Sequence, residues 1–268
     1  MFVDDRWPVY QEYLRYIWGA PFDRFHKEGL DVDLDGDVDS YNTREIVVFR
    51  ACLIGYEPCI KMSMELFGQL RRNCSGTDQL LSGIDCNTIP LYLRQHVYSA
   101  AIAHGTQEDF DFLLEKYTKE HYLLERDRIF HGMCGTDSRE NSAKMWLYLV
   151  ENPARENFFT RAVACSKKLT RKTLMMDFFV KRPSLLAEVR TKLGNKLNAL
   201  LLLAHRQIYT REQCDQFDKM VEPLGEYGRS AGQLRYQTLA RIEWREAVAA
   251  HIAGNASEAL AEMKKLQF

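Results

Sequence analysis

The stretch TQEDFDFLLEKYTKE, residues 106–120, shows the pattern that decides the fold class. Thr106 is a residue type that favours the cap of a helix, and acidic residues follow it in the first turn, where the helix dipole favours negative charge. Apolar side chains then recur at positions i, i+3, i+4 and i+7, namely Phe110, Leu113, Leu114 and Tyr117. Because that spacing places them on one face of an α-helix, the stretch predicts an amphipathic helix.

The same period recurs along most of the chain. Residues 58–72 place Met62, Leu66 and Leu70 on one stripe and end in basic residues, which suit a helix C-terminus. Three further segments show the helical pattern: 142–152, 172–183 and 230–253. Since no segment alternates in the manner of a β-strand, the sequence predicts an all-α protein.

Glycine and proline are scarce, with 15 Gly and 7 Pro in 268 residues, and this scarcity favours long regular elements. No Pro-, Gly- or Ser-rich linker divides the chain, so we expect one continuous domain spanning residues 1–268. Helices of about 10 to 15 residues separated by short turns favour a solenoid of antiparallel pairs. An irregular helical bundle is the alternative, because no strict repeat can be counted.

Charge and hydrophobicity exclude several classes of partner. The formal net charge is −1, so binding to nucleic acid or to an anionic membrane surface is not implied. The longest apolar stretch, residues 197–204, is too short to cross a bilayer. The first residues lack the basic flank and apolar run of a signal peptide, and we predict none there.

An acidic stretch, DVDLDGDVDSYN at residues 31–42, resembles a calcium-binding loop. Its carboxylates alternate along the chain, and Gly36 occupies the sixth position, where such a loop turns sharply. The carboxylates are Asp31, Asp33, Asp35, Asp37 and Asp39. The twelfth position holds Asn42 in place of the usual bidentate glutamate. The alternative is a solvated connection whose acidic residues cap a helix that starts near Thr43.

No catalytic constellation is visible in the sequence. There is no H-E-x-x-H, C-x-x-C, Walker A loop, nucleophile elbow or dinucleotide fingerprint, and the seven histidines are scattered. We therefore predict no catalytic residue, no zinc site and no bound cofactor for this chain, with calcium as the one metal considered. Two N-glycosylation sequons are present, at Asn73 and Asn255, and they matter only in the secretory pathway.

Two segments, residues 44–70 and 87–117, resemble the C-terminal helical domain of the aminopeptidase-N-like zinc aminopeptidases. That family includes the antigen-trimming enzymes of the endoplasmic reticulum. The residues that match its pattern are Arg50, Ala51, Cys52, Cys59, Leu66, Phe67, Pro90, Leu93, Arg94, Val97, Tyr98, Gly105, Asp109, Phe110 and Phe112. Weaker similarity continues through most of the remaining chain.

The resemblance implies a right-handed α-α superhelix of antiparallel HEAT-like or armadillo-like helix pairs. Residues 1–30 would form the first helical layer, 31–42 the acidic loop and 43–268 the superhelix. In that family the domain closes over the zinc domain and helps to hold the substrate peptide. The implied partners are therefore the catalytic zinc domain of the same parent chain, peptide substrates and, in some members, a second copy. Zinc is implied only for the parent enzyme.

The resemblance also implies a small disulfide between Cys52 and Cys59, with reduced buried thiols as the alternative. A second cysteine pair of many extracellular members is not expected, because Cys134 lies near one position but Ser99 stands at the other. The well-matched helix offers Arg94 and Tyr98 as peptide contacts, since arginine and tyrosine often anchor ligands. The alternative is structural: Tyr98 would pack in the core and Arg94 would form an ion pair.

Two functions remain open at this point. The first is a non-catalytic domain of an aminopeptidase-N-like enzyme that closes the substrate chamber and binds peptide. The second is a free-standing helical-repeat scaffold, or a pseudo-enzyme, that binds a protein partner. The first implies the secretory pathway, extracellular or anchored to a membrane through upstream parent sequence, and the second implies the cytoplasm.

Overall fold

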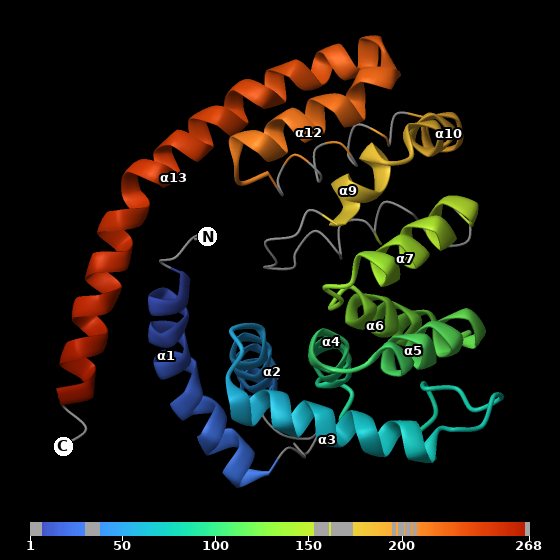
Figure 1. Ribbon diagram of the computed structural model, residues 1–268. Coiled ribbons are helices and arrows are strands. Elements are labelled where there is room, and N and C mark those ends of the chain that lie inside the picture. The colour runs from blue at the N-terminus through green and yellow to red at the C-terminus, as the bar shows by residue number, and fades with distance from the viewer. Residues whose placement is uncertain are drawn as a thin grey trace. The chain divides into compact units, whose positions relative to one another are not determined.

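The computed structural model describes residues 7–29, 38–152, 174–194 and 208–265, together with residues 161, 197, 201 and 205. All regular structure in these residues is helical, which confirms the all-α prediction (Figure 1). The chain divides into two compact units, where the sequence suggested one continuous domain. The first unit holds residues 7–136 and the chain from Ala253 onward, and the second holds residues 137–252. The right-handed superhelix stays a prediction.

The first unit is built from six helices and the last part of a seventh. Their bounds are α1 Trp7–Glu28, α2 Val38–Leu53, α3 Glu57–Asn73, α4 Arg94–His104, α5 Gln107–Lys119, α6 Leu123–Met133 and α13 Glu226–Lys265. Helix α1 packs on α2, and α4 packs against both α3 and α6. Since α4 has neighbours on several sides, most of its side chains are buried, including Val97, Tyr98 and Ala101. This helix is the centre of the first unit.

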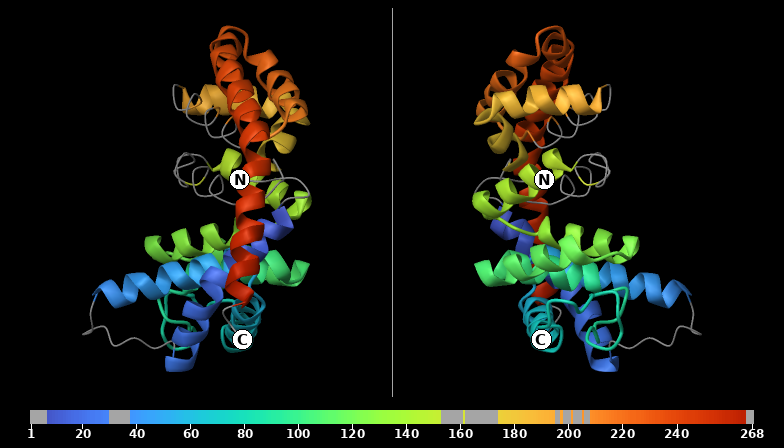
Figure 2. Two further views of the ribbon diagram at one scale, coloured as in Figure 1. Left: turned by 90° about the vertical axis from the view of Figure 1, so that its left-hand side faces the viewer. Right: turned by 90° about the vertical axis from the view of Figure 1, so that its right-hand side faces the viewer.

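The second unit contains shorter helices and the first part of α13. Their bounds are α7 Arg139–Glu151, α9 Leu174–Val180, α10 Pro183–Leu193, α12 Arg211–Val221 and the 3-10 turn η1 Glu222–Leu224. Helix α9 packs against α7, α10 and α12. Arg235 of α13 pairs with Asp215 and Asp218 of α12, and Arg241 donates to the carbonyl of Ile208. Helix α13, residues 226–265, extends beyond the predicted helix at 230–253 at both ends, and Figure 2 draws it as one continuous helix.

The stretch at residues 106–120 forms the predicted helix, α5. The backbone amide of Thr106 donates to the Asp109 carboxylate over 2.7 Å, so one of the amides at the helix start is satisfied. Of the predicted apolar face, Phe110, Leu113 and Tyr117 are buried. In the described residues no helix is long and apolar enough to span a bilayer.

The acidic stretch is shorter than predicted. Helix α2 begins at Val38, so Asp39 already lies in its first turn and the expected start near Thr43 was wrong. The Thr43 hydroxyl donates to the Asp39 carbonyl over 2.6 Å, inside the helix. The other aspartates of the calcium hypothesis, Asp31, Asp33, Asp35 and Asp37, lie outside the described residues, and calcium binding stays a prediction.

We predict that Gly132→Ala destabilises the protein, because α6 lies very close to α4 at Gly132. A Cβ there would lie 2.3 Å from the Cβ of Tyr98, too close for any real contact. The overpacking should lower the free energy of unfolding in urea by about 1–3 kcal/mol.

The matched control is Gly68→Ala within α3. Its Cβ would meet only the mobile end of Arg72, at 3.5 Å. Because alanine favours a helix interior over glycine, this change should raise the free energy of unfolding by about 0.5–1 kcal/mol. Equal changes in the free energy of unfolding for the two variants would contradict the close approach of α6 to α4.

Candidate functional site

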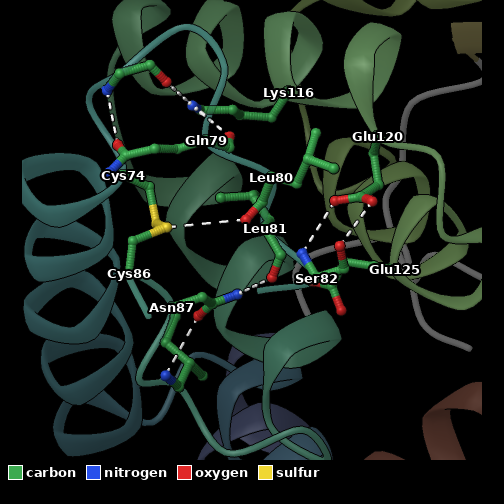
Figure 3. Close-up of a disulfide and its surroundings, with 12 residues drawn as sticks. Cys74, Gln79, Leu80, Leu81, Ser82, Cys86, Asn87, Lys116, Glu120 and Glu125 are labelled. Carbon is green, nitrogen blue, oxygen red and sulfur yellow. Dashed lines mark hydrogen bonds between the residues drawn. A yellow bond between two sulfur atoms is a disulfide. The ribbon is translucent and has the colours of Figure 1, made fainter. Parts of the chain in front are cut away.

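A long irregular loop, residues 74–93, joins α3 to α4 and is held closed by a disulfide between Cys74 and Cys86 (Figure 3). Sequence analysis did not predict this bridge. Cys52 and Cys59, which the family resemblance paired, also form a disulfide. Cys134 is disulfide-bonded too. Among the described cysteines, Cys214 is free and buried.

Two buried charged side chains of α5 and its C-cap hold the same loop (Figure 3). The Lys116 ammonium donates to the carbonyls of Gly76 and Gln79 over 2.7 and 2.9 Å. The Glu120 carboxylate accepts from the amide and the hydroxyl of Ser82 over 3.0 and 2.8 Å. Burial lowers the pKa of Lys116. Side chains thus form hydrogen bonds with backbone groups of the loop, whereas in a helix the backbone groups bond to one another.

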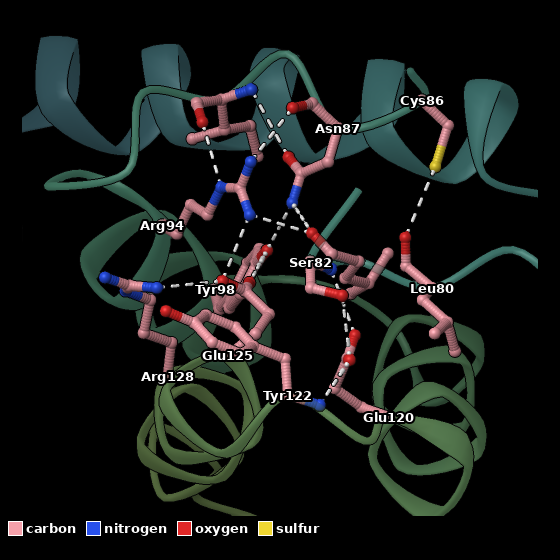
Figure 4. A network of polar contacts seen from close by, with 12 residues as sticks. Leu80, Ser82, Cys86, Asn87, Arg94, Tyr98, Glu120, Tyr122, Glu125 and Arg128 are labelled. Atoms are coloured by element: carbon pink, nitrogen blue, oxygen red, sulfur yellow. Dashed lines mark hydrogen bonds and ion pairs between the residues drawn. The ribbon is translucent and has the colours of Figure 1, made fainter. Parts of the chain in front are cut away.

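The base of the loop rests on a buried ionic network centred on Glu125 of α6 (Figure 4). One oxygen of its carboxylate accepts from the Tyr98 hydroxyl over 2.8 Å. The other accepts from Arg94 and Arg128, each over 3.1 Å. Asn87 donates to the Tyr98 hydroxyl over 2.9 Å. Desolvation and the neighbouring carboxylate of Glu125 raise the pKa of Tyr98 well above its usual value.

The guanidinium group of Arg94 donates hydrogen bonds to the loop as well as to Glu125. It donates to the carbonyls of Leu81, Asn87 and Ile89 over distances of 2.8 to 3.1 Å. Arg94 is 2% exposed and Tyr98 is fully buried. The assignment of Arg94 and Tyr98 as peptide contacts is therefore corrected: neither side chain reaches a surface. The structural alternative, an ion pair for Arg94 and core packing for Tyr98, describes both.

The described residues hold no group of three or more His, Cys, Asp or Glu side chains that could bind a metal ion. The zinc that the family resemblance implies for a parent enzyme therefore has no fitting ligand set among them. The buried network has its donors and acceptors paired with one another, so it is a structural device and offers no reacting group. A binding site has to be sought at the surface.

A cavity of about 400 Å³ lies within the first unit, beside α1. Such a volume is within the range of small-ligand sites. One face of α1 supplies most of its lining, the turn before α3 supplies Tyr56 and α13 supplies Leu260. The lining residues are Glu12, Arg15, Tyr16, Gly19, Ala20, Asp23, Tyr56 and Leu260. Sequence analysis missed this site, because the face of α1 becomes a cavity only where Tyr56 and Leu260, distant in the chain, pack beside it.

The α1 cavity depends on close packing between α1 and Tyr56. A Cβ on Gly19 would lie 2.9 Å from the Tyr56 ring, so the ring can rest on α1 only where a glycine stands. The Tyr56 hydroxyl donates to Asp23 over 2.8 Å. Arg15 donates to the carbonyl of Ile54 over 3.2 Å, which ties α1 to the same turn. Desolvation and the Asp23 carboxylate raise the pKa of Tyr56 to about 12.

The chemistry of the α1 cavity suits a mixed polar and apolar ligand. Carboxylates and a guanidinium group line it together with two phenol rings and a leucine side chain. A segment of peptide offers the same mixture of charges, amides and apolar groups.

A family model for the ERAP1-like C-terminal domain matches residues 1–243 of the 268. The match covers both units except for the end of α13. It agrees with the resemblance that residues 44–70 and 87–117 carry.

We predict that Glu125→Gln lowers the free energy of unfolding by about 3–5 kcal/mol, because it leaves the buried guanidinium of Arg94 without its counter-charge. Urea unfolding followed by circular dichroism measures the change. The control is Glu115→Gln, which removes an exposed pair with Lys119 (2.8 Å) and should change stability by about 0.5 kcal/mol or less. Losses of similar size in the two variants would contradict a special role for Glu125.

A second prediction concerns alkaline pH. Folding raises the pKa of Tyr56 from 10.0 to about 12. The contribution of this phenol to the free energy of unfolding is therefore complete below pH 10 and is lost as the pH rises through about 12. Tyr56→Phe should therefore flatten the fall in unfolding free energy over this range. Tyr236→Phe, which removes a phenol that is 79% exposed, is the control and should leave the fall unchanged.

Proposed function

The chain belongs to the ERAP1-like C-terminal domain family, and we propose that it is the non-catalytic C-terminal domain of an aminopeptidase-N-like zinc aminopeptidase. In this proposal it closes the substrate chamber and helps to bind the peptide. The observation that carries the proposal is the family match over residues 1–243. Zinc and the catalytic groups are assigned to the zinc domain of the parent chain, and no reaction step is assigned to this chain.

The proposed contribution to catalysis is binding energy supplied away from the reacting bond. An aminopeptidase cleaves the first peptide bond, so a domain that holds the rest of the peptide contributes by orientation. The α1 cavity supports this role, because its two tyrosines can pack on peptide groups while Asp23 and Arg15 can pair with charged side chains. Closing a lid domain over the substrate would also exclude water from the chamber.

The disulfides support the proposed location. Bonds such as Cys52–Cys59 and Cys74–Cys86 persist in oxidising compartments and are rare in the cytosol. We therefore propose the secretory pathway, with the protein extracellular or anchored to a membrane through other parts of its parent.

A second candidate function is a helical scaffold or pseudo-enzyme that binds a protein partner or a second copy. The observation that favours it is a set of large apolar side chains at the surface. Ile84 is 80% exposed, Leu123 is 63% exposed and Trp244 is 64% exposed. Exposed apolar groups of this size often belong to interfaces when they form a patch.

The size of the endogenous protein distinguishes the two candidate functions. An immunoblot with an antibody against this region should show a band far above 31.3 kDa if the chain belongs to a larger aminopeptidase. A band at 31.3 kDa would contradict the leading proposal and favour the scaffold.

Peptide binding gives a further prediction. Ala20→Leu fills part of the α1 cavity from the exposed face of α1 and should weaken binding of a labelled peptide about tenfold, which corresponds to about 1.4 kcal/mol. Fluorescence anisotropy measures the affinity. Ala247→Leu, at an exposed position of α13 outside the cavity, is the matched control and should have no effect. Unchanged binding in Ala20→Leu would remove the cavity from the proposed site.

A further inference from the structure

The sequon Asn73-Cys74-Ser75 lies at the end of α3, where the loop begins. Asn73 is the last residue of the helix and is exposed, and Ser75 is exposed as well. The neighbouring loop residues 76–79 are also exposed, so a glycan on Asn73 would extend into solvent without displacing any packed group.

The middle residue of this sequon is immobilised in the folded protein. Cys74 is fully buried and is bonded to Cys86 (Figure 3). Its backbone amide donates to the carbonyl of Leu70 over 2.8 Å, which completes the last turn of α3. The disulfide to Cys86 and the hydrogen bond to Leu70 therefore both restrain the backbone around Cys74.

We propose that Asn73 is an N-glycosylation site and that closure of the Cys74–Cys86 disulfide limits how often it is occupied. A transferase must bind the asparagine and the serine of a sequon together in its own site. Folded Asn73-Cys74-Ser75 can reach such a site only if the last turn of α3 unwinds and Cys74 leaves the core. Glycan transfer therefore has to precede closure of the disulfide, so the two reactions compete with each other.

Both reactions are ordinary chemistry of the secretory pathway. In the first, the Asn73 amide nitrogen forms a bond to the anomeric carbon of a lipid-diphosphate-linked oligosaccharide. The bond from that carbon to the diphosphate oxygen breaks, the lipid diphosphate leaves and the amide gives up one proton. In the second, the thiols of Cys74 and Cys86 lose two electrons and two protons to an oxidant disulfide, which becomes a dithiol.

The chain carries its own internal control for this competition. The second sequon, at Asn255, lies within α13 and contains no cysteine. Asn255 is exposed, and the nearest cysteine in the sequence is Cys214. Occupancy of Asn255 should therefore not depend on the Cys74–Cys86 bridge.

The test expresses the full chain in cultured animal cells behind a cleavable secretory leader and measures the glycosylated fraction at Asn73 and Asn255 by glycopeptide mass spectrometry. In the unchanged chain we expect partial occupancy at Asn73. Cys86→Ser should raise that fraction, because the sequon stays open for longer. Cys74→Ser removes the same bridge from its other end, keeps a sequon and should raise the fraction too.

Cys59→Ser is the matched control, because it removes a different disulfide, Cys52–Cys59, and leaves the sequon's own bridge intact. It should not change occupancy at Asn73, and the glycopeptide assigned to this site should be lost in Asn73→Gln. The inference is overturned if Asn73 carries no glycan in any of the chains, if it is fully occupied in the unchanged chain, or if Cys59→Ser raises occupancy as much as Cys86→Ser does.

This inference rests on the proposed location in the secretory pathway, but the two can fail separately. The added leader brings the chain into that pathway whatever its natural location is. An endogenous protein whose cysteines are all reduced would contradict the proposed location. A disulfide-bonded protein with no glycan at Asn73 would contradict only the inference.

Discussion

The buried carboxylate of Glu125 is the group around which the first unit is organised. A charge without solvent is costly unless ion pairs and hydrogen bonds compensate it, and Glu125 obtains both from Arg94, Tyr98 and Arg128. The same arginine reaches back to three carbonyls of the irregular loop at residues 74–93. One charge therefore aligns α4 with α6 and fixes a loop that has no regular structure of its own.

Two charged residues, one in α5 and one at its C-cap, extend this principle along the loop. Lys116 and Glu120 supply a donor and an acceptor to backbone groups that a helix or a sheet would otherwise satisfy. The disulfide between Cys74 and Cys86 adds a covalent restraint. These restraints explain why charged residues with low exposure occur in an otherwise apolar core.

The cavity beside α1 has a different origin. It exists because a glycine on α1 lets the Tyr56 ring lie against the helix, while small and charged residues on the same face leave space beside the ring. Its mixed polar and apolar lining fits the peptide-binding role that we propose for this chain. The exposed apolar side chains of Ile84 and Leu123 lie outside this cavity and are the observation behind the scaffold alternative.

The sequence by itself determined the fold class, the helix at residues 106–120 and the family, because helical periodicity and the motif around Cys52 and Cys59 are local patterns. It did not determine which polar residues are buried. Arg94 and Tyr98 stayed open between peptide contacts and structural roles, because nothing local shows that a carboxylate 31 residues away will face Arg94. The Cys74–Cys86 bridge and the α1 cavity were likewise decided only by the tertiary structure. The physical reason is that pairing of buried charges, disulfide partners and hollow surfaces depends on distances between helices, which side-chain spacing along one helix does not encode.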